Sequence, residues 1–265
     1  MKKCKLCNKK FDESQLTKEH YPAKSVGNDD LVRINLLEVF DDIIKNPFKF
    51  KYIVSSGIGF EDVENYYSNS EMAKSIYPEG RYAMTLCRKC NSFLGKYDEA
   101  YKKFYDNDGD PKRIKGFSRE TKLRIIKAIY GKFLSLPETN GEDLDFRDFI
   151  SEERCEECRG EWRLFFIKRD TITSDMQTAK LNYDNGVVYH LSYDKFIFDL
   201  LNFEKPNKYF MNNIFDILEK NYKLQVKSVE KDGFYSEAFI TNLFRNLLQY
   251  IKWRYYLGNR QLKCN

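Results

Sequence analysis

Three pairs of cysteines, each with two residues between its members, limit what this chain can fold into more than any other feature. The pairs are Cys4/Cys7, Cys87/Cys90 and Cys155/Cys158, and the seventh cysteine is Cys264. No apolar stretch of the kind that a secretory signal needs follows the basic N-terminus. We therefore expect a cytoplasmic protein with reduced thiols, which in such pairs bind a metal rather than form disulfides.

The first two pairs have the composition of a zinc site. Each pair forms a tight turn that aims two sulfurs at one ion, and four thiolates complete the tetrahedral shell of a structural Zn2+. We predict that Cys4, Cys7, Cys87 and Cys90 hold such an ion. The intervening segment, residues 8–86, is much longer than the usual gap of about 15–20 residues.

The third pair, Cys155/Cys158, lies in a hydrophilic stretch. We favour two reduced thiols in a turn. The alternative is a second zinc site that His190 and Cys264 would complete.

Composition and charge leave several functions open. Hydrophobic residues make up 42% and charged residues 32% of the chain, enough apolar material for a core. No run approaches the ~20 apolar residues of a membrane span, so we expect no membrane association. The net charge of +5 permits a polyanionic partner without requiring one.

Hydrophobic spacing predicts an α+β fold with two domains. The breaker at residues 106–111 places the boundary. An N-terminal domain, 1–109, carries a helical insertion at about 28–80, and a mixed α/β C-terminal domain covers 110–265. The expected helices are 30–45, part of 61–78, 91–104, 118–134 and 236–256, and the expected β-structure is a strand at 162–167 and a hairpin at 183–189.

A further set of residues carries chemistry. Glu19-His20-Tyr21-Pro22 lies between the two cysteine pairs, and Asn91 follows Cys90, with Gly95 and Asp98 on the same predicted helix. In this order the pattern resembles the HNH endonuclease family, the ββα-metal or treble-clef nucleases, in the branch with a four-cysteine zinc. The resemblance covers roughly residues 1–105, leaves the insertion unmatched and implies nothing about 111–265.

The resemblance implies a zinc-stabilised ββα module that hydrolyses DNA phosphodiester bonds and leaves 5′-phosphate and 3′-hydroxyl ends. It implies that His20 is the general base, a role that suits an imidazole with an ordinary pKa of ~6.5. It also implies one catalytic Mg2+ or Mn2+ on the oxygens of Glu19 and Asn91. Adjacent side chains of a strand point in opposite directions, so we expect a bend or bulge at Glu19 and His20.

Two positions depart from the family pattern. The middle Asn of the family, which braces the loop, has two candidates here, Asn28 and Asn35. Asp98 is assigned as a third residue near the catalytic metal, and its plainer interpretation is an exposed helix charge. The plainer interpretations of the other three are a structural His20, a solvated Glu19 and a helix N-cap at Asn91.

Basic residues near the site are the expected contacts to nucleic acid. The run over residues 111–127 has the plainer interpretation of a solvated helix face. The candidates are Arg88, Lys89, Lys96, Lys112, Arg113 and Lys115.

Together these patterns predict a metal-dependent HNH endonuclease that cuts DNA, with RNA as the alternative substrate. From the resemblance we expect a role in bacterial defence or restriction, with a second copy or a defence-system protein as partner. The alternative function is a non-catalytic zinc module that binds nucleic acid or protein. The pair Glu19-His20 favours the enzyme, because a purely structural zinc module has no need of it.

Overall fold

The computed structural model describes residues 1–29, 31–34, 38, 41–42, 45–46, 70, 73–110, 112–169, 176–204 and 211–227. The chain divides into two compact units, residues 1–29 with 79–228 and residues 30–78 with 229–265. The predicted boundary at 109/110 lies inside the first unit, and the predicted insertion spans the first segment of the second unit.

The N-terminal part of the first unit contains two short antiparallel sheets and a helix. β1 (Lys2–Lys3) pairs with β2 (Lys10–Phe11), and β3 (Leu16–His20) pairs with β6 (Tyr82–Cys87). α4 (Arg88–Asp106) begins where β6 ends, with Cys87 as its N-cap, which confirms the predicted helix. β3, β6 and α4 thus form a ββα arrangement, in which residues 21–81 connect the two strands.

A six-stranded sheet forms the rest of the first unit's β-structure. Its path runs β11 (Asn212–Asn213), β7 (Arg163–Arg169), β10 (Phe196–Leu201), β9 (Gly186–Tyr193) and β8 (Met176–Tyr183), and all these neighbours are antiparallel. β12 (Val226–Lys227) pairs with β7 in parallel. β7 confirms the predicted strand, and the turn between β8 and β9 confirms the predicted hairpin.

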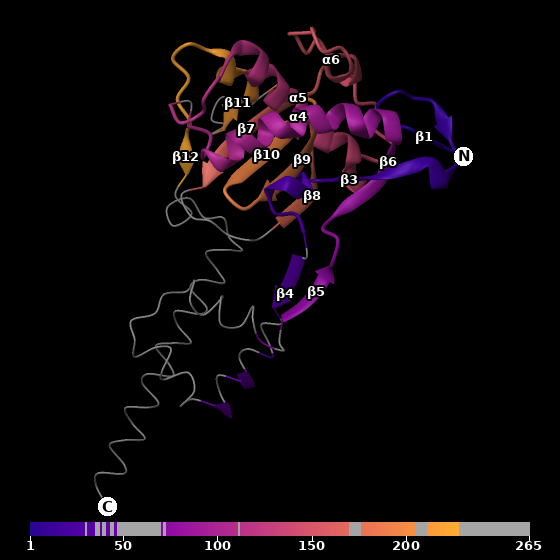
Figure 1. Ribbon diagram of the computed structural model, residues 1–265, viewed down its shortest axis with the longest axis vertical. Helices are drawn as coiled ribbons and strands as arrows, with labels where there is room; N and C mark the ends of the chain where they lie inside the picture. Colours follow the sequence, from indigo (N-terminus) through magenta and orange to yellow (C-terminus); the bar gives the residue numbers. More distant parts are fainter. Residues whose placement is uncertain are drawn as a thin grey trace, which may run out of the picture. The chain divides into compact units, whose positions relative to one another are not determined.

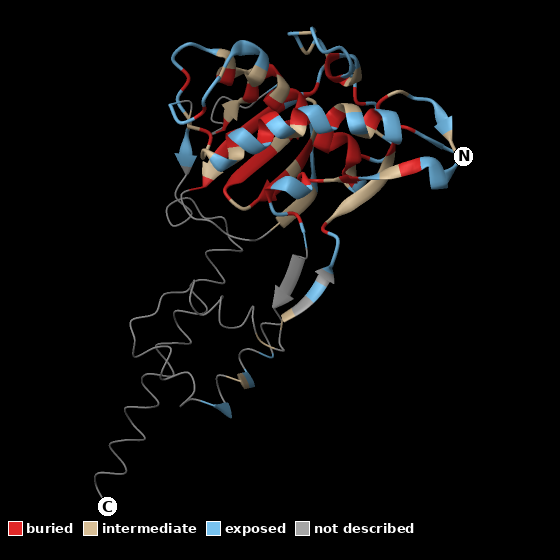
Figure 2. Ribbon diagram, viewed as in Figure 1, coloured by how far each residue is buried: buried red, intermediate tan, exposed pale blue. Residues whose placement is uncertain are grey.

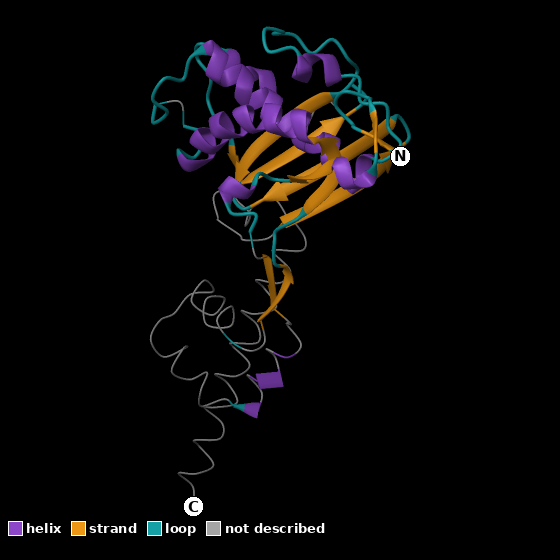
Figure 3. Ribbon diagram, turned by 45° about the vertical axis from the view of Figure 1, so that its right-hand side comes forward, coloured by secondary structure: helices purple, strands orange, loops and turns teal. Residues whose placement is uncertain are grey.

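α4 lies over one face of this sheet (Figures 1 and 3). Aromatic side chains make the contact. The ring centroid of Phe104 lies 5.2 Å from that of Phe196 and 6.2 Å from that of Phe166, and Tyr101 lies 6.2 Å from Phe198. Phe104 is fully buried. Removing a buried Phe side chain costs ~3–5 kcal/mol, so these contacts anchor the ββα segment to the sheet.

α5 (Arg119–Ser135) is the most buried helix of the described residues. The Ser118 side chain caps it by accepting a hydrogen bond from the Thr121 amide at 3.2 Å, which confirms the predicted helix start. Every residue from Ile125 to Ser135 is buried (Figure 2). α5 contacts α4, β3 and β6, and the short helix α6 (Arg147–Ser151) packs against it.

The described residues of the second unit include two strands inside the expected helical insertion. β4 (Leu31–Ile34) pairs antiparallel with β5 (Ala73–Tyr77), so the helix predicted at 30–45 is wrong over residues 31–34. Residues 73–77 form a strand, and most of the rest of 61–78, where part was predicted as helical, lies outside the described residues. Among the described residues after β4, Glu38, Asp41, Asp42 and Lys45 are helical. A short apolar run with β-branched residues fits a strand as well as a helix, and here the pairing with β5 decided. The helix predicted at 236–256 lies outside the described residues.

In the part of the chain that the structure describes, no helix has both the length and the apolar character needed to cross a membrane.

Candidate functional site

The first two cysteine pairs meet in one cluster. Cys4 and Cys7 lie in the turn between β1 and β2, Cys87 ends β6, and Cys90 lies in the first turn of α4. All four sulfurs lie within 4.8 Å of one another. Tetrahedral zinc with Zn–S bonds of about 2.3 Å would place its sulfurs roughly 3.8 Å apart, so the cluster fits a structural Zn2+ with small adjustments.

Backbone hydrogen bonds shape the turn that presents the first two sulfurs. The Cys4 amide donates to the Lys9 carbonyl and the Asn8 amide donates to the Cys4 carbonyl, both at 2.9 Å. Asn8 has a left-handed φ of 59°, a conformation that Asn tolerates better than most residues. The Cys87 amide also donates to the Cys4 sulfur at 3.3 Å, which lowers the cost of a negative sulfur there.

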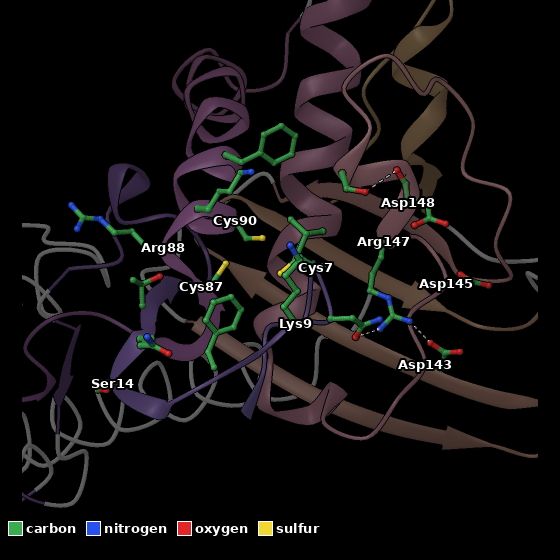
Figure 4. A pocket seen from close by; sticks show the side chains of 18 residues that line it. Cys7, Lys9, Ser14, Cys87, Arg88, Cys90, Asp143, Asp145, Arg147 and Asp148 are labelled. Atoms are coloured by element: carbon green, nitrogen blue, oxygen red, sulfur yellow. Dashed lines mark hydrogen bonds and ion pairs between the residues drawn. The ribbon is translucent and has the colours of Figure 1, made fainter. Parts of the chain in front are cut away.

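The side-chain view shows the sulfurs of Cys7, Cys87 and Cys90 directed toward one another (Figure 4). Burial raises the pKa of the Cys4 thiol and that of the Cys90 thiol. A bound cation would supply the charge that makes these groups thiolates.

The third pair does not join a cluster among the described residues. The Cys155 thiol donates to the Glu157 carbonyl at 3.3 Å. His190, proposed above as a partner for a second zinc, instead bonds Asp199 through Nδ1 at 2.7 Å. Cys264 lies outside the described residues.

A separate hollow of about 300 Å³ brings the other predicted site residues together. Glu19 and His20 come from the end of β3, and Asn91 and Asp98 come from α4. The sequence predicted a bend or bulge at Glu19 and His20. The pairing of β3 with β6 has its register shift just before these residues, between Thr17 and Lys18. The residues that line the hollow are Lys18, Glu19, His20, Ala23, Lys24, Ser25, Asn91, Gly95, Asp98, Glu99, Lys102 and Lys132.

The His20 ring is held by a backbone carbonyl. Its Nε2 lies 2.9 Å from the Glu79 oxygen. A carbonyl oxygen only accepts, so Nε2 carries the proton and Nδ1 carries the lone pair of the neutral ring. Burial lowers the pKa of His20, the bond to Glu79 opposes this, and the nearby charges of Lys132, Lys24 and Lys18 lower the pKa further. The imidazole is therefore neutral at pH 7, with Nδ1 as its basic atom.

Asn28 braces the loop that follows His20. Its side chain is fully buried and donates to the Pro22 carbonyl at 2.7 Å and to the Arg81 carbonyl at 2.8 Å. Its Oδ1 accepts from the Arg81 amide at 2.7 Å. Of the two asparagines that the sequence left open, Asn28 makes these bridging bonds, and Asn35 lies outside the described residues.

Asn91 points its amide group at β3. Its Nδ2 donates to Thr17 Oγ1 at 2.9 Å and to the Lys18 carbonyl at 2.8 Å. Both amide protons are thus used, and its Oδ1 accepts no hydrogen bond from the described residues. The interpretation of Asn91 as the helix N-cap is wrong, because Cys87 holds that position.

Two carboxylates of the hollow share one ammonium group. Lys132 of α5 places its Nζ 2.5 Å from Glu19 Oε1 and 2.8 Å from Asp98 Oδ2. Burial works to lower the pKa of Lys132, but the charges of Asp98 and Glu19 outweigh it and raise that pKa. Burial also raises the pKa of Glu19, and the charge of Lys132 opposes it. Glu19 is therefore no solvated carboxylate, since its side chain is only 4% exposed.

The six basic residues predicted to contact nucleic acid do not line this hollow. Arg88 and Lys89 line a larger hollow of about 1580 Å³ beside the cysteine cluster (Figure 4). Lys96 lies over the Phe93 ring, and Arg113 is paired with Asp108 at 3.4 Å. Lys112 and Lys115 are exposed.

Three of the seven basic residues of the longer run, Arg113, Arg119 and Arg124, pair with acidic side chains. Arg119 pairs with Glu156 at 2.7 Å, and Arg124 pairs with Glu153 at 3.0 Å. These pairs favour the interpretation of a solvated, internally paired helix face. The basic side chains at the hollow, which the sequence reasoning missed, are Lys18, Lys24, Lys102 and Lys132.

Lys132 had a signal in the sequence. It stands within Ile125–Ser135, a largely apolar stretch on a predicted helix, where a lysine is buried only if a partner compensates it. The identity of that partner was not visible, because Glu19 lies 113 residues earlier.

Comparison with known proteins leaves the family open: no family model, no curated protein and no solved structure matches this chain. The site therefore rests on its own geometry, a four-cysteine cluster able to bind zinc and a separate hollow that joins His20 to three oxygen-bearing side chains.

Proposed function

We propose that this protein is a metal-dependent endonuclease of the HNH type that hydrolyses DNA phosphodiester bonds, with His20 as its general base. The observation that carries the proposal is the bond from His20 Nε2 to the Glu79 carbonyl, on a residue that shares a hollow with Glu19 and Asn91. This bond leaves Nδ1 as a free base in a neutral ring, the state needed to take a proton from water near pH 7.

The order of the elements supports the proposal. β3 and β6 form the hairpin, α4 follows directly, and the cysteine cluster fastens the start of α4 to the β1–β2 turn. The resemblance implies this ββα arrangement for HNH nucleases. Asn28 supplies the brace that the family's middle Asn provides, since it links the loop after His20 to Arg81.

The oxygen donors of the hollow fit a hard divalent ion. Glu19, Asn91 and Asp98 would hold Mg2+ or Mn2+, which prefer carboxylate and amide oxygens. Asp98 Oδ1 is buried and has no hydrogen-bond partner, a costly state that a cation would relieve. When bound, the ion would neutralise charge on the scissile phosphate and on the leaving oxygen.

The chain's own residues do the remaining work. His20 Nδ1 takes the proton of the attacking water, and the Glu79 carbonyl holds the ring in place. Asn91 keeps its amide protons on β3, which turns its oxygen away from the strand. A structural zinc on the cysteine cluster would keep α4, and with it Asn91, in register with His20.

The test is nicking of supercoiled plasmid DNA by the full chain with Mg2+ or Mn2+. We expect His20→Ala to lower the rate at least ~100-fold, as loss of a general base does. The matched control is His190→Ala, which removes the chain's only other histidine, on β9, and should leave the rate within about threefold. Zinc content and circular dichroism should match the wild type in both variants.

Three outcomes would contradict the proposal. Full nicking by His20→Ala would remove the mechanism. Equal losses in both histidine variants would assign the effect to folding. If the wild type cuts no plasmid with either ion, the alternative function, a non-catalytic zinc module, would remain. The same series on labelled RNA distinguishes the two substrates.

A further inference from the structure

Lys132 gives the hollow a charge balance that the predicted site residues alone do not have. Its side chain is only 5% exposed, and its Nζ contacts one oxygen of Glu19 and one oxygen of Asp98. It lies on α5, after the segment that carries the family resemblance. A buried ammonium costs several kcal/mol unless charged partners compensate it. The burial of the Lys132 ammonium therefore depends on the two carboxylates.

A second lysine of the same helix shows what a structural role looks like. Lys127 is also buried, but its Nζ donates to the backbone carbonyls of Glu152 and Glu153 at 2.6 and 3.0 Å. These bonds hold the chain after α6 and lie outside the hollow. Lys127 therefore holds the backbone after α6, whereas Lys132 and both of its carboxylate partners line the hollow.

Lys132 bonds one of the two oxygens of each carboxylate and leaves the other oxygen unbonded. Lys132 occupies Glu19 Oε1 and Asp98 Oδ2. Glu19 Oε2 and Asp98 Oδ1 make no hydrogen bond to the described residues, and they remain for a metal ion.

Two carboxylates and one ammonium carry a net charge of −1, one charge short of neutralising a divalent ion. Most of the other charged side chains of the hollow are paired, as Lys18–Glu79, Lys24–Asp29 and Lys102–Asp106, and Glu99 is exposed.

Resting on the proposed function, we propose that Lys132 is a positioning residue that couples metal binding to nucleic-acid binding. Its ammonium keeps the site too weakly negative to hold the divalent ion tightly alone. The phosphodiester anion of the substrate supplies the missing charge, so the ion and the nucleic acid bind together. Without the ammonium, the two carboxylates would balance a divalent ion by themselves.

The test measures Mn2+ binding to the full chain by the paramagnetic resonance of free Mn2+, with and without a short DNA duplex. All variants carry His20→Ala, so that the duplex stays intact. In this parent we expect the duplex to tighten Mn2+ binding at least ~10-fold. Lys132→Met should bind Mn2+ at least ~10-fold tighter without DNA, and the gain from DNA should fall below about threefold.

The controls separate charge from packing. Lys127→Met buries the same uncharged side chain on the same helix and should keep the parent's Mn2+ affinity and DNA effect. Lys132→Arg keeps the charge and should also resemble the parent. Lys132→Gln repeats the test with a second uncharged side chain if the Met variant does not fold.

Two results would overturn the inference: Mn2+ binding to Lys132→Met that is unchanged or weaker, or a parent whose Mn2+ affinity does not respond to DNA. Because the measurement needs no cleavage, it separates the two proposals. A protein that cuts nothing but shows the expected Mn2+ pattern would lose the proposed function and keep the coupling. A protein that nicks DNA but shows no tightening would keep the function and lose the coupling.

Discussion

The brace at Asn28 allows a quantitative test of how the loop after His20 is held. Asn28→Ala removes three hydrogen bonds of 2.7–2.8 Å from a site with no solvent exposure. It leaves the carbonyls of Pro22 and Arg81 and the Arg81 amide without this partner. At about 1 kcal/mol for each bond, we expect the free energy of unfolding to fall by ~3 kcal/mol. That is a large share of the 5–15 kcal/mol typical of a domain.

The assay is urea unfolding of the full chain, followed by circular dichroism, with hydrogen exchange at the Arg81 amide as a local readout. Asn28→Asp keeps the shape and the bond from that amide, but it turns a carboxylate toward two carbonyl oxygens, so it should cost at least as much as Ala. The matched control is Asn107→Ala at the end of α4, which loses one exposed bond to the Lys103 carbonyl and should cost less than ~1 kcal/mol. A loss for Asn28→Ala no larger than that of the control would refute the reasoning.

Two further predictions concern zinc and a glycine. Purified protein should contain one zinc per chain by elemental analysis, and two zinc ions per chain would contradict this. Cys87→Ser should lose the zinc together with folded structure near α4. Cys155→Ser should keep the zinc. Gly80→Ala should destabilise the protein by at least ~2 kcal/mol in the same urea assay, because φ is +76° and a Cβ would lie 2.0 Å from the Asn28 carbonyl oxygen. Gly95→Ala on α4 meets nothing within 4 Å and should stabilise by up to ~1 kcal/mol, so a similar effect at both glycines would argue against the clash.

Local patterns predicted the elements that local forces decide. α4 and α5 follow from apolar residues at helical spacing and, for α5, from the cap at Ser118. The β8–β9 hairpin follows from its turn residues. The strand β4 was predicted as a helix, because a short apolar run contains no record of the partner strand, and β5 lies about 40 residues later.

Cysteine spacing predicted a contact between distant parts of the chain, which hydrophobic spacing did not. Two thiol pairs suited to one metal already implied that residues 4–7 and 87–90 meet, and the structure brings all four sulfurs together. The meeting of His20 and Asn91 at one hollow follows from the same constraint, because each lies only a few residues from an element that the cluster fixes.

The sequence by itself determined the helices α4 and α5, the cysteine cluster and the residue types available for chemistry, since these depend on near neighbours or on the strong preference of thiols for metal. Only the tertiary structure decided which groups complete the hollow. The Glu79 carbonyl that orients His20, the Arg81 backbone that Asn28 holds and the Lys132 ammonium between two carboxylates all come from distant segments. Such contacts form only when the burial of α5 and the pairing of β3 with β6 bring those segments together, and no periodicity along the chain encodes them.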